Sequence, residues 1–423
     1  MSMTLVVLLV LFVVLIAMSV PIAYSIGFAS LIALMVDGTV PLIVVAQRVF
    51  VSIDSFPLLA APFFVIAGEI MMVGGISRRL VNLAKELVGW MAGGMAYVTF
   101  VASALFGARS GSSVATTSAI GGLMYPELLK ANYRPSYAAA IGATAGSLGV
   151  LIPPSIAFVI YGTQTNTSVG SLFLVGAAVG ILAMVGYCIA VKLTLKKYLS
   201  DVCPSGPKPT LRSAIQATKD AFWGLLSPII ILGGIYSGKF TATEAAVVAI
   251  VYSILICMFV YKELTVKQLI AALIKSSINS GAILMLTGIA SLFSWVITVN
   301  GLAAMLENFV LSMGLGLIGF LLIINLIYLI LGMCMDTIPV IILTAPIFLP
   351  IARQYGISSL HFGALMIFNL IFGVITPPFG VDVFMANTYS KQPVMDIFRD
   401  CKWFWVAGVL MILIVTFVPL LMY

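Results

Sequence analysis

The dipeptide Pro-Pro occurs twice in this chain, and the two copies stand 224 residues apart in matching surroundings. The first lies in GVLIPPS at 149–155 and the second in GVITPPF at 373–379, and the same offset pairs Pro126 with Pro350. Proline lacks a backbone N–H and clashes with the preceding helical turn, so a helix must open at each pair. We therefore expect two halves built on one plan, each with a broken helix.

Composition restricts the class of fold. Of the 423 residues, 62% are hydrophobic and 8% are charged, whereas soluble domains carry about 25% charged residues. A transmembrane helix needs about 20 apolar residues, so the apolar stretches leave room for about ten to twelve crossings. The apolar runs do not alternate as the strands of an outer-membrane barrel do. The sequence predicts an all-α polytopic membrane protein embedded in a lipid bilayer.

Charge and cysteine content exclude several classes of function. The net charge of +7 comes from basic residues at the ends of apolar runs, which indicates membrane topology and not a nucleic-acid partner. The first apolar run lacks the basic start and small-residue exit of a signal peptide, so we expect a retained helix. Five cysteines are scattered singly, and there is one histidine. Neither a transition-metal site nor a disulfide framework is predicted.

The two halves, 1–200 and 212–423, meet at a polar linker rich in Pro and Gly, 201–211, whose flanking lysines and arginines predict a cytoplasmic position. Each half is expected to contain a close pair of apolar segments, a third crossing, an amphipathic stretch, a re-entrant hairpin, a broken helix and a closing crossing. In the first half, the pair is split near Pro21, and the third crossing, amphipathic stretch, hairpin and broken helix are expected at 56–73, 76–88, near 89–128 and near 135–163. In the second half, the pair is split near 239–244, and the same four elements are expected at 277–297, 301–311, near 314–352 and near 358–390.

The two amphipathic stretches carry opposite charge signals. The first contains Arg78, Arg79 and Lys85, whereas the second has no basic residue and contains Glu307. Interfacial helices at the same step of a repeat but on opposite sides of the membrane indicate an inverted-topology repeat. Each half then needs an odd number of full crossings, and we expect five, with both chain ends on the outer face.

Two polar points interrupt the hairpin segments and are the first site candidates. The first tip, 107–117, gathers glycines and hydroxyls, including Ser110, Gly111, Ser112 and Ser113. Backbone left without helix partners inside a membrane must be buried in protein or line a watery cavity. Freed carbonyls and hydroxyls are hard oxygen ligands suited to an alkali cation. The alternative is that the small residues only allow close helix packing.

The second tip, 332–339, contains Asp336 between apolar arms, at or near the position that matches Ser112. Charges inside a membrane are costly and usually functional, although a structural ion pair or a helix cap would also explain this acid. The opened carbonyls near 149–152 and 373–376 are placed to share a cation with the adjacent tip, and Ser155 and Thr376 add hydroxyls. A packing kink is the alternative for each Pro-Pro break.

Arg109 is the charge next to the first tip. Arginine suits bidentate recognition of a carboxylate, so an anionic substrate is expected. A structural pairing of Arg109 with Asp336 or Asp382 is the alternative. Weaker candidates are Asp382 itself, Asn387 and the polar stretch 163–168, which is read as an outer loop.

At these residues the chain resembles a known family. Its motifs RSGSS at 109–113, LIPPS at 151–155, MDTIP at 335–339 and ITPPFG at 375–380 look like those of the large membrane subunit of TRAP (tripartite ATP-independent periplasmic) transporters. The resemblance covers essentially the whole chain. It implies an ion-transporter-superfamily fold with two re-entrant hairpins, in the bacterial inner membrane, and sodium-coupled uptake of organic acids by an elevator motion. It also implies two partners, a periplasmic substrate-binding protein and a separate small membrane subunit of four helices.

The resemblance also assigns roles to individual residues. It implies two or more sodium ions as coupling ions, no other cofactor, and a carboxylate substrate such as a sialic acid or a C4-dicarboxylate between the tips. The implied sodium ligands are, for the first site, Ser110, Gly111, Ser112, Ser113, Gly149, Ile152 and Pro153, and, for the second, Asp336, Thr337, Gly373, Thr376 and Pro377. The substrate-site candidates are Arg109, Ser155, Gly380 and Asp382.

A stand-alone carrier, a passive channel and an intramembrane enzyme are the alternatives to a binding-protein-dependent transporter. A stand-alone sodium/carboxylate symporter or antiporter of the same superfamily would work without a partner protein, and a passive channel would not show saturable counterflow. An intramembrane enzyme would need an H-E-x-x-H motif or a nucleophile with a general base. The chain has no such motif, and His361 lies far from the serine cluster in sequence, so we expect no enzymatic activity.

Overall fold

A computed structural model describes residues 2–18, 20–198, 208–312 and 314–419, and these residues form helices and connecting turns without a β-strand. Most of the predicted linker, 201–207, lies outside the described residues. So do the side chains of Arg109 and Glu307, among a few others. Of the predicted linker, the structure describes only residues 208–211. α12 begins at Leu211, and Thr210 caps it.

Seven helices of the described chain are long and apolar enough to cross a membrane, or eight if the bent pair α9 (Pro135–Leu151) and α10 (Ile156–Thr165) is one span. Shorter apolar helices account for further membrane sequence, so fewer full-length spans are present than the ten crossings expected. The seven spans are η1 with α4 (Phe56–Val73), α11 (Val169–Tyr198, apolar to Leu195), α13 with η3 (Ala242–Val260), α14 (Val266–Val299), α16 (Leu317–Cys334), α17 (Thr337–Gln354) and α20 (Val394–Phe417). The chain is a multi-pass membrane protein.

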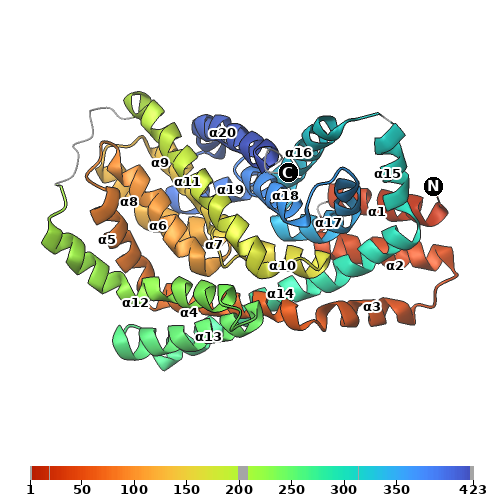
Figure 1. Cartoon of the computed structure of the whole chain (residues 1–423), viewed down its shortest axis with the longest axis horizontal. Coiled ribbons are helices and arrows are strands. Elements are labelled where there is room, and N and C mark those ends of the chain that lie inside the picture. The colour runs from red at the N-terminus through yellow and green to blue at the C-terminus, as the bar shows by residue number, and fades with distance from the viewer. Residues whose placement is uncertain (1, 19, 199–207, 313, 420–423) are drawn as a thin grey trace.

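The helices form two groups, seen in Figure 1. The frame helices run along the lower edge and the sides of that view, and the core helices gather above them. The frame helices are α1 (Met3–Ala17), α2 (Ile22–Asp37), α3 (Ile43–Ile53), α4 (Ala60–Val73), α5 (Ile76–Val88), α12 (Leu211–Tyr236), α13 (Ala242–Leu255), α14 and α15 (Leu302–Ser312). The core helices are α6 (Gly94–Ser110), α7 (Ser113–Thr116), the π-helical turn η2 (Thr117–Gly121), α8 (Gly122–Lys130), α9, α10, α11, α16, α17, α18 (Ser359–Gly373), α19 (Val381–Ser390) and α20.

Two local breaks in the first half of the frame follow from proline. Pro21 precedes α2, and α1 and α2 are separate helices that pack against each other. Ser55 is extended (φ −131°, ψ 117°) directly before η1 (Phe56–Leu59), which contains Pro57 in its first turn and leads into α4. Proline is tolerated in a first turn because the N–H that it lacks has no helical partner there. The second half has no such break, and α14 runs unbroken for 34 residues.

Capping boxes start three frame helices of the second half. Thr210, Thr241 and Thr265 each accept a hydrogen bond from the backbone N–H three residues later, and the side chain at that position returns to the cap. This reciprocal pairing satisfies backbone donors that a helix start leaves open. The frame helices therefore have locally encoded beginnings.

The two broken helices lie at the centre of the core. Every residue of α9 from Ser136 to Leu151 is buried, as is every residue of α18 from His361 to Gly373. A helix buried on all sides needs small or apolar residues all round, and α9 supplies alanine, glycine and serine. Contacts between α9 and α19, and between α10 and α17, join the two halves of the core.

Candidate functional site

The first tip is a two-residue turn between two helical segments. α6 ends at Ser110, Gly111 takes φ +58°, and Ser112 is extended and caps α7, its Oγ accepting from the Ala115 N–H at 3.3 Å. A left-handed φ favours glycine. A Cβ at Gly111 would also lie 3.2 Å from the Pro154 carbonyl oxygen. The positive φ therefore favours glycine at this point, and an added Cβ would crowd the Pro154 carbonyl.

Hydroxyl groups hold the first tip together. The Thr116 Oγ1 donates to the Ser112 carbonyl at 2.8 Å, and the hydroxyls of Ser110 and Thr116 lie 2.9 Å apart. Thr116 was not among the predicted site residues. Its spacing of four from Ser112 places it one helical turn away and was the signal available in the sequence.

The first tip packs directly on the first broken helix. A Cβ built at Gly149 would lie 2.1 Å from the Thr116 Oγ1 and 2.8 Å from the Ser112 carbonyl oxygen. The structure therefore brings Ser112 and Gly149 together, as the pairing of tip and break predicts. Ile152 and Pro153 belong to the same break, but the Ile152 side chain reaches Gly180 of α11.

The second tip has the same plan and a different turn. α16 ends at Cys334, Met335 is extended, and Asp336 caps α17, its Oδ1 accepting from the Thr337 N–H at 2.7 Å. Backbone contact again joins tip and break, since a Cβ at Gly373 would lie 2.4 Å from the Gly332 carbonyl carbon. Asp336 is therefore a helix cap and, at the same time, an exposed carboxylate at the tip.

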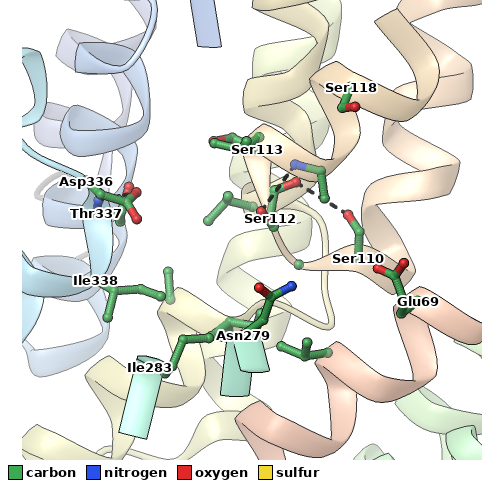
Figure 2. A pocket seen from close by; sticks show the side chains of 18 of the residues that line it. Glu69, Ser110, Ser112, Ser113, Ser118, Asn279, Ile283, Asp336, Thr337 and Ile338 are labelled. Atoms are coloured by element: carbon green, nitrogen blue, oxygen red, sulfur yellow. Dashed lines mark hydrogen bonds between the residues drawn. The ribbon is translucent and has the colours of Figure 1, made fainter. Parts of the chain in front are cut away.

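A cavity of about 500 Å³ opens between the two tips and the frame. Figure 2 shows Asp336 and Thr337 on one side and Ser112 and Ser113 on the other. The predicted site residues of the two tips that line it are Ser110, Gly111, Ser112, Ser113, Asp336 and Thr337. The tips also contribute Val114, Ala115 and Ile338, which were not predicted site residues. The cavity size lies in the range of about 300–1,000 Å³ that is typical of small-molecule sites.

The frame contributes polar residues that the sequence analysis missed. Glu69 of α4 and Lys275 and Asn279 of α14 line the cavity, and the Lys275 Nζ lies 2.6 Å from the Glu69 Oε1. Both charges stand inside apolar runs, and this was the signal that would have identified them. Lys275 remains exposed in spite of its ion pair.

Several predicted site residues do not line the cavity. Ser155 is buried and caps α10, whereas Gly380 takes φ +50° before α19. Thr376 donates its hydroxyl hydrogen to the Phe372 carbonyl at 3.0 Å. Asp382 is fully buried, and neither of its carboxylate oxygens has a hydrogen-bond partner among the described residues. Gly149, Ile152, Pro153, Gly373 and Pro377 are likewise absent from the residues that line the cavity.

Oxygen atoms dominate the donor set at both tips. No group of three or more His, Cys, Asp or Glu side chains that could hold a metal ion exists within the described ranges. A cation at either tip would be held by hydroxyls, backbone carbonyls and a single carboxylate. Such hard ligands suit an alkali or alkaline-earth cation.

Comparison with known families gives one clear match. The model for the DctM component of the tripartite ATP-independent periplasmic transporter matches residues 9–421. The large permease protein DctM of a C4-dicarboxylate TRAP transporter from Pseudomonas aeruginosa is 37% identical over 88% of this chain and 87% of its own. The large permease protein SiaM of a sialic acid TRAP transporter from Vibrio cholerae is 35% identical over 95% of this chain and 91% of its own.

A third relative is longer than this chain. The isethionate TRAP transporter permease protein DctMQ of Oleidesulfovibrio alaskensis is 36% identical over 95% of this chain, which spans 63% of that relative's length. Among solved structures, the Alcanivorax borkumensis YdaH transporter has a TM-score of 0.61 and 16% identity, with 88% of this chain and 87% of that chain covered. Neisseria gonorrhoeae MtrF has a TM-score of 0.56 and 16% identity, with 89% and 85% covered. Both share the fold.

Proposed function

Because this chain belongs to the DctM component family of tripartite ATP-independent periplasmic transporters, we propose that it takes up a small organic anion across the bacterial inner membrane, coupled to sodium. It is a transporter permease and not an enzyme, like its relatives. The observation that carries the proposal is the cavity between two oxygen-rich tips, each packed on a broken helix.

The substrate site of the proposal is the cavity itself. A carboxylate substrate needs a cation, and Lys275 presents its ammonium group there from the frame. Its partner Glu69 holds the ammonium in place at 2.6 Å. Arg109, next to the tip, is the second cation of the proposal. The relatives act on C4-dicarboxylates, sialic acid and isethionate by name, so we propose a small acid of that kind.

The sodium sites of the proposal lie where tip and break meet. The first uses Ser110, Ser112 and the carbonyls freed near Gly149, and the second uses Asp336 with the carbonyls freed near Gly373. The close glycine contacts at both places support this, because they let backbone oxygens approach without intervening side chains. Sodium supplies positive charge beside the anionic substrate, which explains coupling by electrostatics.

The two groups of helices support the proposal of an elevator motion. We propose that the core helices carry the cavity past the frame helices as a body, since the tips belong to the core, whereas Glu69, Lys275 and Asn279 belong to the frame. With the core helices in one position, core and frame residues would line the cavity together. With the core helices in the other position, the frame residues would no longer contribute to it. This is the gating logic of transporters with repeated halves.

Two partners complete the proposal. A small membrane subunit would cover apolar frame surface, where Ile43, Phe50 and Val51 of α3 are exposed. A periplasmic binding protein would deliver the substrate, as the name of the family indicates. The alternative is a stand-alone sodium/carboxylate carrier, which would transport without either partner.

The test has a substrate-free step and a transport step. The chain, purified with its small subunit, is expected to unfold at higher temperature in NaCl than in KCl or choline chloride of equal ionic strength, because a ligand of the folded state raises its stability. Proteoliposomes are then expected to accumulate a labelled acid only with an inward sodium gradient and the binding protein. Equal melting in the three salts together with sodium-independent uptake would reject sodium coupling. Uptake by the chain alone would favour the stand-alone carrier.

A further inference from the structure

Three membrane spans of the frame have an end at the same corner of the molecule. The span Phe56–Val73 stops just before α5, and the span Ala242–Val260 stops just before Tyr261. The span Val266–Val299 begins a few residues after that tyrosine. Because an apolar span covers the hydrocarbon layer and stops where it stops, this corner lies at the level of the lipid headgroups.

Side-chain contacts hold three segments together at this corner. The Arg79 Nη2 lies 2.6 Å from the Glu263 Oε1, and the Arg79 Cζ lies 3.9 Å from the centroid of the Tyr261 ring. The Tyr261 hydroxyl donates to the Asp220 carbonyl oxygen at 3.0 Å and accepts from the Gly224 N–H at 3.2 Å. α5 and α12 also pack side by side (Figure 1). We name the segments 75–79, 219–224 and 261–263 the basic corner.

Positive charge is in excess at the basic corner. Its charged residues are Arg78, Arg79, Lys219 and Lys262 against Asp220 and Glu263. Arg79 and Glu263 neutralise each other. Arg78, Lys219 and Lys262 are exposed, and none of them belongs to an ion pair among the described residues. The corner therefore presents three cations to its surroundings, with Asp220 as the acid beside them.

Aromatic rings are exposed beside these cations. Phe222 and Trp223, one helical turn after Lys219, are 49% and 39% exposed, and their ring centroids lie 5.4 Å apart in an edge-to-face arrangement. The Tyr252 hydroxyl donates to the Trp223 carbonyl oxygen at 2.7 Å and ties this turn to α13. Tryptophan is enriched at the membrane–water interface, where its ring lies at headgroup level. Exposed rings and cations at the end of three spans are typical of a surface in contact with lipid.

We propose that the basic corner binds the headgroup of an anionic phospholipid of the cytoplasmic leaflet. The phosphate oxygens accept charge-assisted hydrogen bonds from Arg78, Lys219 and Lys262, and the acyl chains lie along Phe222 and Trp223. Basic residues favour the cytoplasmic side, and the lipids of that leaflet carry the complementary negative charge. A zwitterionic lipid brings its own cation to the corner and is bound more weakly.

The bound lipid acts on the frame wall of the cavity. α14 begins at this corner and carries Lys275 and Asn279, which line the cavity. A lipid held between α5, α12 and the turn before α14 fixes the depth of this wall in the membrane. The inference concerns the frame alone and does not depend on sodium coupling.

The first experiment measures thermal unfolding of the chain with its small membrane subunit in detergent. Phosphatidylglycerol or phosphatidylcholine is added in increasing amounts. We expect phosphatidylglycerol to raise the melting temperature at the lower concentration, because a ligand of the folded state stabilises it. Lys219→Gln is expected to raise the half-effective phosphatidylglycerol concentration about fivefold, since one cation near an anionic headgroup is lost. The matched control is Lys239→Gln, an exposed lysine beyond the other end of α12, which should leave it unchanged.

The second experiment places the lipid at the corner. Brominated phosphatidylglycerol quenches tryptophan within contact distance, and the difference between the wild type and Trp223→Phe isolates the emission of Trp223. We expect this emission to be quenched at a lower mole fraction of brominated phosphatidylglycerol than of brominated phosphatidylcholine. The double variant Arg78→Gln with Lys262→Gln is expected to lose that preference.

Three outcomes would overturn the lipid site. Equal quenching of Trp223 by the two brominated lipids would show that the corner does not select charge. Quenching by neither lipid would show that the small subunit covers the corner. An equal effect of Lys219→Gln and Lys239→Gln on the melting series would show a general attraction of the protein for anionic lipid. Sodium-independent uptake, by contrast, would reject the proposed coupling and leave this site in place.

Discussion

At the first hairpin tip the chain turns through Gly111 in the left-handed region, whereas at the second it turns through Met335 in an extended conformation. The residue after each turn caps the following helix, Ser112 with a hydroxyl and Asp336 with a carboxylate. The first tip compensates for its neutral cap with further hydroxyls at Ser110 and Thr116. The two tips show that the same backbone arrangement can carry either several hydroxyl groups or a single carboxylate.

In both halves the hairpin tip packs closely on a glycine of the broken helix. Gly149 faces a side chain and a carbonyl oxygen, whereas Gly373 faces only backbone atoms of Gly332 and Met333. Side chains can rotate away from an added methyl group, but backbone atoms of two packed helices cannot. The second contact is therefore the less tolerant of the two.

The largest effect is expected from Gly373→Ala. Its Cβ would lie 2.4 Å from the Gly332 carbonyl carbon, so α16 and α18 must separate. Overpacking of this kind costs about 1–3 kcal/mol or more. We expect a clear fall in melting temperature and loss of uptake, with a smaller fall for Gly149→Ala.

Gly281→Ala is the control for both, because a Cβ there meets nothing within 4 Å. It is expected to melt at or slightly above the wild-type temperature, since alanine favours helix. If Gly149→Ala proved more damaging than Gly373→Ala, the proposed order of the two contacts would be wrong.

The next effect tests the charge difference between the tips. Asp336→Asn keeps the shape of the cap but removes the carboxylate, and we expect at least a roughly tenfold weaker sodium dependence of uptake, equivalent to about 1.4 kcal/mol. Ser112→Ala removes one hydroxyl and leaves the carbonyl, so its effect should be smaller, together with about 1 kcal/mol of lost capping. Sodium titrations of initial uptake rates measure both. Equal effects would show that the charge at Asp336 is irrelevant to coupling.

A smaller effect is expected at the frame wall that faces both tips. Lys275→Met is expected to raise the KM for the anionic substrate several-fold, by about 1 kcal/mol, because one exposed cation of the cavity is lost. Lys275→Arg should retain most of the affinity. Lys267→Met, an exposed residue of the same helix outside the cavity, is the control. An unchanged KM would leave Arg109 as the substrate's cation.

The smallest effect concerns the far ends of the two hairpins. At the end of the first, Glu127 pairs with Lys85 of the frame helix α5 and with Lys130, whereas at the end of the second, Arg353 donates to Ser359 within the core. Hydrogen bonds from Lys85 and Lys130 lower the pKa of Glu127 to about 2. The lowered pKa means that the pairing stabilises the fold above the ordinary pKa of the acid and weakens as the pH falls toward 2.

We therefore expect Glu127→Gln to destabilise the transporter by about 1 kcal/mol at neutral pH, since partly exposed ion pairs are screened. The difference should shrink below about pH 4.5. Thermal unfolding at pH 7 and pH 4 measures it. A difference that grows on acidification would contradict the ion pair, and Arg353→Gln is the corresponding change in the second hairpin, with no ion pair to lose among the described residues.

The breaks in the core were predictable from the sequence to within a few residues. Pro153, Pro377 and Gly111 act on their own backbone, by a missing N–H or an allowed positive φ, and this effect does not depend on distant residues. The predicted crossing at 56–73 is confirmed as the span Phe56–Val73, but the separate helix α3 (Ile43–Ile53) before it was not predicted. The second half contains that helix as part of α14.

The composition of the cavity was predictable only in part. Ser112 and Asp336 were found because each stands at a polar break in an apolar run. Lys275 and Glu69 belong to unbroken helices 206 positions apart, and only the packing of α4 on α14 pairs them across the cavity. The burial of Asp382 could not be seen either, since its neighbours come from α9 and η2, far away in the sequence.

The sequence by itself determined that this chain is a helical membrane protein, where its core helices open, and which family it belongs to. These properties depend on composition and on backbone restraints that act within a few residues. Only the tertiary structure decided which polar groups share a cavity, which are enclosed, and which buried carboxylate has no hydrogen-bond partner among the described residues. Those properties arise from contacts between segments that are distant in the chain, where burial and close packing set the cost of each polar group.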